Sequence, residues 1–190
     1  EVFETPKRLN TYGMPGTIDN PSAEAFPEGQ LSVSSSVFGG TIRTNLSFQI
    51  TNSITLSFRY ARIPVRSSKY RGYTWDRSFD AHFSVSNEKA YLPTISLGLR
   101  DFIGTGWYTS EYIVGTKSIG SLELTAGLGF GRLAGRDPFS NPLSILSSTF
   151  KARNSTSHYT GGTIGKNVGW FQGDASSFFG LRYQLGDRLS

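Results

Sequence analysis

Residues 41–61, TIRTNLSFQITNSITLSFRYA, alternate between apolar and polar side chains over almost their whole length. Leu46 and Phe48 share one face in the first half, and Leu56 and Phe58 share one face in the second. A period of two is the pattern of a β-strand that has one apolar and one polar face. The stretch therefore predicts two antiparallel strands joined by a short turn.

The parity of the apolar positions indicates how these two strands pair. Antiparallel partners must carry their apolar residues on the same face, and a three-residue loop joins two strands whose apolar positions are both even. A loop at residues 51–53 then sets Phe48 opposite Leu56 and Leu46 opposite Phe58.

The same alternation recurs along the chain, whereas helical periodicity is nearly absent. Gly39 and Gly40 form a two-residue loop of the kind that β-hairpins favour, and they join a preceding strand of odd parity to the strand at 41–50. The sequence predicts eight strands, at residues 31–38, 41–50, 53–61, 77–86, 92–100, 107–117, 122–131 and 177–185.

The predicted connections differ in length at the two ends of the sheet. One end has short turns, and the other has two long loops, of which the first mixes basic and aromatic residues suited to lipid phosphates or sugar rings. This sorting is typical of a bacterial outer-membrane barrel. The short turns are 51–53, 87–91, 118–121 and 186–188; the other end has 39–40, 63–75, 101–106 and 132–175.

The polar face of the predicted strands contains charged residues and glycines. Glycine suits the wall of a lumen better than a solvated strand face. The face includes Arg43, Gln49, Arg59, Asp80, His82, Arg100, Glu111, Glu123 and Arg182, together with Gly98, Gly115, Gly127, Gly129 and Gly131. On the apolar face, four tyrosines near strand ends fit an aromatic girdle at a membrane interface: Tyr60, Tyr108, Tyr112 and Tyr183.

We therefore expect an all-β fold, an antiparallel outer-membrane β-barrel with its apolar face toward lipid. The alternative is a soluble antiparallel sandwich or lipocalin-like barrel, in which the apolar face would point inward. The chain has 190 residues and no run of 18 apolar residues, so no transmembrane helix is predicted.

Composition and motifs give no support for an enzyme. The absence of cysteine excludes disulfides and thiol nucleophiles, and a net charge of +5 does not by itself select a partner. The motif GLGFG at 127–131 is not a dinucleotide fingerprint, because no helix follows it. His82 and His158 have no neighbouring triad pattern. We expect no catalytic residue, no cofactor, no metal site and no nucleic-acid partner.

Two longer stretches carry distinctive motifs, YGMPGTIDNPSAEAFPEGQL at 12–31 and YLPTISLGLRDFIGTGWYTSEYIVGTKSIGSLELTAGLGFGRLAG at 91–135. Both resemble the YjbH family, outer-membrane proteins associated with exopolysaccharide biosynthesis and export. The residues that match the family motifs include Gly13, Gly16, Pro21, Ala23, Arg100, Asp101, Gly104, Gly106, Glu111 and Tyr112.

The resemblance implies an outer-membrane barrel that takes part in exopolysaccharide or capsule secretion, or in retaining the polysaccharide at the surface. Its partners would be membrane lipid or lipopolysaccharide, the polysaccharide and periplasmic export proteins. Family members are usually several times longer, so the eight strands either close on themselves or form the first part of a larger barrel. Two other functions stay open: a structural or porin-like barrel without a polysaccharide role, and a soluble carbohydrate-binding β-sandwich.

We divide the chain into residues 1–29, a periplasmic lead-in that folds back against the barrel mouth as a plug, and residues 30–190, the strands and loops of the barrel. A three-residue turn centred on Gly120 would set Lys117 opposite Glu123 and Glu111 opposite Gly129, so that the Glu111 carboxylate projects into an open lumen. The residues expected to line a path for glycan are Arg59, Arg100, Glu111, Gly127, Gly129 and Arg182.

Overall fold

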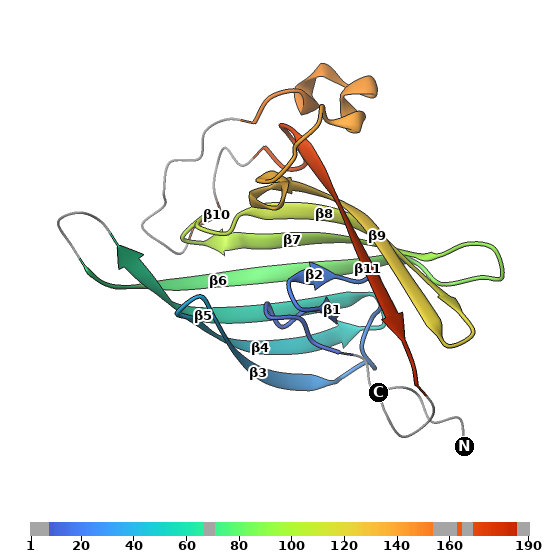
Figure 1. The fold of residues 1–190 in the computed structure, drawn as a ribbon, viewed down its shortest axis with the longest axis horizontal. Helices are drawn as coiled ribbons and strands as arrows, with labels where there is room; N and C mark the ends of the chain where they lie inside the picture. The colour runs from blue at the N-terminus through green and yellow to red at the C-terminus, as the bar shows by residue number, and fades with distance from the viewer. Residues whose placement is uncertain (1–7, 67–70, 154–162, 165–168, 186–190) are drawn as a thin grey trace.

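The computed structural model describes residues 8–66, 71–153, 163–164 and 169–185. His158 and the predicted turn at 186–188 lie outside these ranges. In the described part, one large curled antiparallel sheet dominates the molecule (Figure 1). Its main strands are β3 (Leu31–Phe38), β4 (Thr41–Thr51), β5 (Ile54–Arg66), β6 (Arg71–Ser86), β7 (Thr94–Gly104), β8 (Ser110–Ile119), β9 (Leu122–Gly131) and β11 (Ala175–Tyr183).

The order of these strands is β11-β9-β8-β7-β6-β5-β4-β3, so each of the eight pairs with its neighbours along the chain and β3 and β11 form the two edges. The smaller elements are the ribbon of β1 (Gly16–Thr17) and β2 (Asn20–Pro21), the 3₁₀ turns η1 (Arg132–Ala134), η2 (Pro142–Ile145) and η3 (Ser148–Phe150), and β10 (Thr163–Ile164), which pairs with β7. No helix in the described ranges is long and apolar enough to cross a membrane.

The hairpin of β4 and β5 has the predicted partners, because Leu46 pairs with Phe58 and Phe48 pairs with Leu56. The turn is one residue shorter than predicted, since Thr51 pairs with Ile54. A β-bulge between Gln49 and Thr51 accommodates the extra residue, and the register further along the hairpin is preserved.

The Gly39–Gly40 turn is also confirmed. Phe38 pairs with Thr41 across it, and the two glycines have φ angles of +57° and +79°. Positive φ at both central positions is the requirement of the hairpin turn whose twist matches the flanking strands.

The prediction of a long loop at residues 63–75 is wrong. Strand β5 continues to Arg66 and β6 begins at Arg71, so the hairpin extends far into this stretch. Aromatic pairing stabilises the extension: the rings of Tyr60 and Trp75 stack with centroids 5.0 Å apart. The Arg62 guanidinium lies 3.7 Å from the centroid of the Tyr73 ring. Basic and aromatic residues thus continue the strand.

The prediction of a three-residue turn around Gly120 is also wrong. Ile119 pairs with Leu122, which leaves a two-residue turn and shifts the whole β8–β9 register by one position. Lys117 consequently pairs with Leu124, and Glu111 pairs with Phe130. The inward face of β8 therefore differs from the prediction, and it includes Tyr112 and Val114, which are both 1% exposed.

Tyr112 and Tyr108 do not belong to an outward aromatic girdle. Tyr112 lies opposite Gly98, where a Cβ atom would lie 1.9 Å from the tyrosine ring. Gly98 therefore provides the space that allows Tyr112 to turn inward. The Tyr108 ring contacts the ring of Tyr12 inside the molecule, with centroids 6.0 Å apart. Tyr183 does lie on the outer face and is exposed.

The two faces of the sheet have the predicted polarity: the polar face is buried and the apolar face is exposed. The inward side chains include Asn45, Ser47, Gln49, Thr55, Ser57, Arg59, Asp76, Ser78, Asp80 and His82, all of them buried. The outward side chains include Leu46, Phe48, Ile50, Phe79, Ile95, Leu124, Phe179 and Leu181, all of them exposed. The described residues form one sheet of this kind and not the two packed sheets of a sandwich.

Replacing Gly98 with alanine tests the packing of Tyr112. The new methyl group would overlap the Tyr112 ring, so we expect a loss of about 1–3 kcal/mol in the free energy of unfolding. Gly115→Ala on β8 is the matched control, because the nearest atom would be 3.7 Å away. Urea unfolding followed by circular dichroism measures both variants. Equal midpoints would contradict the inward position of Tyr112.

Candidate functional site

The N-terminal segment, residues 8–30, lies against the inner face of the sheet (Figure 1). Its first turn is held by the Asn10 side chain, whose oxygen accepts hydrogen bonds from the backbone N–H groups of Tyr12 (2.9 Å) and Met14 (3.1 Å). Gly13 approaches the sheet so closely that a Cβ atom would lie 2.6 Å from both Asn45 and Ser47. A larger residue at this motif position would push the segment away from the sheet.

Polar side chains of the sheet bind the backbone of the N-terminal segment along its length. The Ser47 hydroxyl donates to the Gly13 carbonyl (2.5 Å) and Arg100 donates to the Asp19 carbonyl (2.7 Å). The contacts continue across the sheet: Ser96 to the Ala23 carbonyl (2.7 Å), the Ala23 N–H to Thr116 (2.8 Å), and the Phe26 N–H to Gln49 (3.1 Å). The segment therefore covers the inner face from β4 to β8 and is not confined to one end.

Arg59 lies at the centre of this interface and is completely buried. Its Nη1 donates to Asp80 Oδ2 at 2.5 Å, and its Nε lies 3.7 Å from Asp76 Oδ2. The guanidinium also lies over the rings of Tyr12 (4.9 Å) and Tyr108 (5.2 Å). Arg59 is on the inner face as predicted, but neighbouring side chains enclose it.

The motif RDFIGTG, residues 100–106, connects β7 to this charged centre. Asp101 has a φ of +51° at a bulge in β7, and its backbone N–H donates to Asp80 Oδ1 at 2.7 Å. The Asp101 side chain accepts from the N–H of Tyr108 (2.9 Å), and the Thr105 hydroxyl donates to Asp76. The motif thus folds the β7–β8 connection onto the aspartates of β6.

Steric constraints explain why glycine occupies positions 104 and 106 of this motif. A Cβ at Gly104 would lie 2.3 Å from Asp101 Oδ1 and 2.6 Å from the Arg77 carbonyl. Gly106 has a φ of +78°, which L residues rarely adopt. Arg100 contributes in a different way, because its guanidinium lies 4.0 Å from the centroid of the Tyr12 ring and so binds the N-terminal segment.

A second polar cluster surrounds His82 and Tyr112. The Tyr112 hydroxyl lies 2.9 Å from His82 Nδ1, and His82 Nε2 lies 3.1 Å from the carbonyl oxygen of Glu24. The motif residue Ala23, adjacent to Glu24, is fully buried and packs with Tyr112 and Val114. These contacts hold the second half of the N-terminal segment against β6 and β8.

Glu111 does not project into an open lumen, because the register of β8 places it on the face opposite to the inward Tyr112. Its carboxylate binds Arg153 in a bidentate ion pair, with N–O distances of 2.7 and 2.9 Å, and accepts from the N–H of Phe171 at 3.0 Å. The carboxylate is nearly inaccessible because the connection between β9 and β11 folds over it. Arg153 lies in an irregular stretch, so strand periodicity gave no signal for this partner.

Three other residues that were predicted to line a glycan path, Gly127, Gly129 and Arg182, lie in a filled interior. A Cβ at Gly127 would lie 2.3 Å from the Phe178 ring, and a Cβ at Gly129 would lie 2.5 Å from Leu133. Both glycines make room for side chains of their own chain. Arg182 forms an ion pair with Glu123 and lies 3.5 Å from Glu24, and so links β11 to β9 and to the N-terminal segment.

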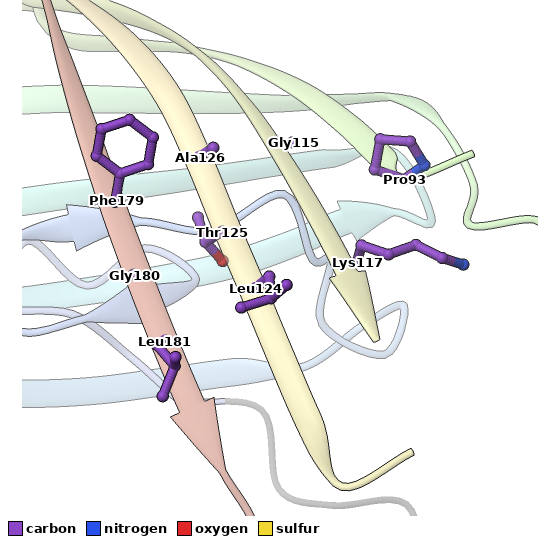
Figure 2. A pocket seen from close by; sticks show the side chains of 9 residues that line it. All are labelled: Pro93, Gly115, Lys117, Leu124, Thr125, Ala126, Phe179, Gly180 and Leu181. Atoms are coloured by element: carbon purple, nitrogen blue, oxygen red, sulfur yellow. The ribbon is translucent and has the colours of Figure 1, made fainter. Parts of the chain in front are cut away.

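The outer face contains an apolar groove of about 620 Å³ across β8, β9 and β11 (Figure 2). The small residues Gly115 and Ala126 lie in its middle, and Phe179 and Leu181 of β11 lie along one side. The groove is continuous with the exposed apolar surface of the sheet and is separate from the buried polar interior.

Together these features define a class of protein: a curled antiparallel sheet that buries a polar inner face under its own N-terminal segment and exposes an apolar outer face. The chain belongs to the YjbH family, because the family model described as "Exopolysaccharide biosynthesis protein YbjH" matches residues 8–190. This family membership confirms the resemblance seen in the sequence.

A protein of Escherichia coli (strain K12) named "Uncharacterized lipoprotein YjbH" is 29% identical over 179 residues, which cover 91% of this chain and 25% of that protein. The chain therefore spans about a quarter of the length of this relative. No solved structure matches the chain.

Replacing Arg59 with alanine tests the charged centre. The change would leave Asp76 and Asp80 buried without their cation, and we expect a loss of about 3–5 kcal/mol in the free energy of unfolding. Arg77→Ala removes an exposed arginine from the same part of the sheet and should cost less than about 1 kcal/mol. Denaturant unfolding distinguishes the two variants.

A compensated variant separates loss of charge balance from loss of packing. Arg59→Met combined with Asp76→Asn and Asp80→Asn removes the buried charges together, so it should recover part of the stability lost in Arg59→Ala. Equal stabilities of Arg59→Ala and Arg77→Ala would mean that the buried ion pairs do not support the fold.

Proposed function

We propose that the chain forms part of the wall of a bacterial outer-membrane β-barrel, which takes part in exopolysaccharide secretion or surface retention and does not itself catalyse a reaction. The observation that carries this proposal is the inverted polarity of the sheet. Buried Arg59, Asp80 and His82 lie on its inner face, whereas Phe48 and Phe79 are each 42% exposed on the outer face.

The energetics of the outer face favour a lipid environment. Each Å² of apolar surface left in water costs roughly 25 cal/mol compared with burial, and monomeric soluble proteins rarely expose large continuous apolar patches. The outer face of the sheet carries exposed apolar side chains on β4, β6, β7, β9 and β11. Hydrocarbon in contact with it would remove this cost, which makes membrane lipid or lipopolysaccharide the natural partner of this face.

The inner face has the composition of a barrel interior. Membrane barrels have polar interiors that are either filled with water or plugged by other parts of the chain. Here the N-terminal segment occupies the inner face, through hydrogen bonds such as those that Ser47 and Arg100 donate to its carbonyl groups. This supports a plug-like role for the N-terminal segment.

The two edges of the sheet support a barrel larger than these eight strands. Strands β3 and β11 each have an edge without a partner among the described residues, and unpaired edges are unfavourable in hydrocarbon. The relative from Escherichia coli is about four times longer than the matched region. Further strands of a longer chain could therefore pair with both edges and close the barrel.

The polysaccharide role rests on the family description. The word "lipoprotein" in the name of the Escherichia coli relative supports a location in the cell envelope, where periplasmic export proteins are candidate partners.

A structural or porin-like barrel is the second candidate function, since the inverted polarity of the two faces supports it equally. A soluble carbohydrate-binding sandwich is disfavoured by the exposed apolar face. An enzyme is disfavoured because the buried carboxylates of Asp80 and Glu111 bind arginines.

The outer face can be tested with Phe48→Arg in the full-length protein. In a membrane, an arginine near the bilayer centre costs about 2–4 kcal/mol, so the yield of protein folded into lipid vesicles should fall strongly. In a soluble protein the same exposed substitution would change stability by about 0.5 kcal/mol or less. Phe48→Leu is the control and should fold like the wild type. Equal yields of the two variants in vesicles would contradict the membrane assignment.

The polysaccharide role is tested by deleting the gene for the full-length protein. Secreted or surface-bound polysaccharide should fall and should be restored by the wild-type gene, as measured by quantifying hexose in the medium and on the cells. A porin-like barrel would instead leave the polysaccharide unchanged and alter the uptake of small solutes. An unchanged amount of polysaccharide in both fractions would refute this half of the proposal.

A further inference from the structure

A cleft of about 700 Å³ lies between the N-terminal segment and the sheet, at the end where the short turns are. Residues 24–28 of the segment form one wall. The other wall comes from the ends of the strands and their turns, with Asn52 between β4 and β5, Asn87 after β6 and Thr116 on β8. This volume is in the range of sites that bind small molecules or a few sugar rings.

The cleft is lined by hydrogen-bonding groups that suit sugar hydroxyls. Two amides, several hydroxyls and three carboxylates line it, and the carboxylates belong to Glu24, Glu28 and Glu88. Carboxylates and amides can each hydrogen-bond more than one hydroxyl group, which is the requirement for holding a sugar ring in one orientation. The lining thus differs from the outer groove, which is mainly apolar.

The charge of the cleft is opposite to that of the whole chain. The chain carries a net charge of +5, yet no lysine or arginine is among the residues that line the cleft. Lys117 binds Glu88 from outside the lining at 2.8 Å, and Arg182 lies 3.5 Å from Glu24. The hydrogen bond from Lys117 lowers the pKa of Glu88, so this carboxyl is ionised at neutral pH. For Glu28, the described residues provide no ion pair.

We propose that this cleft binds a segment of the exopolysaccharide that carries no acidic groups, namely neutral or amino sugars. Lys117 and Arg182 neutralise Glu88 and Glu24 from outside the lining, which leaves the Glu28 carboxylate to repel uronate, sulfate or phosphate groups. The carboxylates, amides and hydroxyls of the lining can all form hydrogen bonds with sugar hydroxyl groups. The inference rests on the proposed function and adds to it the chemical class of the glycan. Because one wall is the N-terminal segment, a bound glycan would contact the segment and the sheet together.

Binding is measured with three defined probes and the full-length protein in detergent. The probes are a β-1,4-linked glucose hexamer, a glucosamine hexamer and a uronate hexamer, titrated by isothermal calorimetry at neutral pH. We expect the glucose and glucosamine hexamers to bind at least about tenfold more tightly than the uronate hexamer, since the negative charge of the uronate is repelled by the nearby Glu28 carboxylate.

Two variants locate the binding and its charge preference. Asn87→Trp places a large side chain at the exposed edge of the cleft and should weaken binding of the glucose hexamer at least about tenfold. Glu28→Gln should reduce the discrimination against the uronate hexamer several-fold. Asp137→Asn is the matched control, because it removes a carboxylate from an exposed position just beyond η1. It should leave both the affinity and the discrimination unchanged. Circular dichroism verifies the folding of each variant.

The outcomes separate this inference from the proposed function. Equal or tighter binding of the uronate hexamer, binding of no hexamer at all, or unchanged binding in folded Asn87→Trp would each overturn the assignment of the cleft. The membrane and secretion tests do not depend on these titrations. If the titrations contradict glycan binding in the cleft but membrane assembly and secretion are normal, the proposed function is therefore unaffected.

Discussion

The buried ion pairs of Arg59 with Asp80 and Asp76 are the interaction on which the other parts of the interior depend. A completely buried guanidinium loses its hydration, so it is tolerated only where nearby carboxylates and other favourable contacts compensate for that loss. The aromatic rings of Tyr12 and Tyr108 enclose it, and the RDFIGTG motif brings the Asp101 N–H to Asp80. The family motifs therefore act first as parts of one buried polar centre.

This centre explains why the N-terminal segment and the sheet form a single unit. The inner face is too polar to pack against an apolar layer, so its side chains need polar partners. The backbone of residues 8–30 supplies them. The outer face is left apolar and exposed, and that combination leads to the proposed barrel of the cell envelope.

Much of the sheet could be predicted from the period-two pattern, including the pairing of Phe48 with Leu56 and the Gly39–Gly40 turn. The β8–β9 register could not be predicted in this way, because the residues around Gly120 are compatible with both a two-residue and a three-residue turn. The choice between them depends on Tyr112, which turns inward only because Gly98 stands opposite it on the neighbouring strand. That contact joins residues from two strands and leaves no trace in local periodicity.

The sequence by itself determined the strands, the polarity of most of their faces and the family. Each of these follows from the order of neighbouring residues or from motifs, which are local properties. Only the tertiary structure decided what the polar residues do. The sequence indicates that Arg59 and Glu111 are charged and inward, but strand register turns Glu111 to the other face, and whether Arg59 faces an open lumen depends on what lies opposite. Their partners, Asp76, Asp80 and Arg153, approach through pairing of strands and folding of a long connection. Because a buried charge requires a partner in space, its role is decided by contacts that the chain makes only once it is folded.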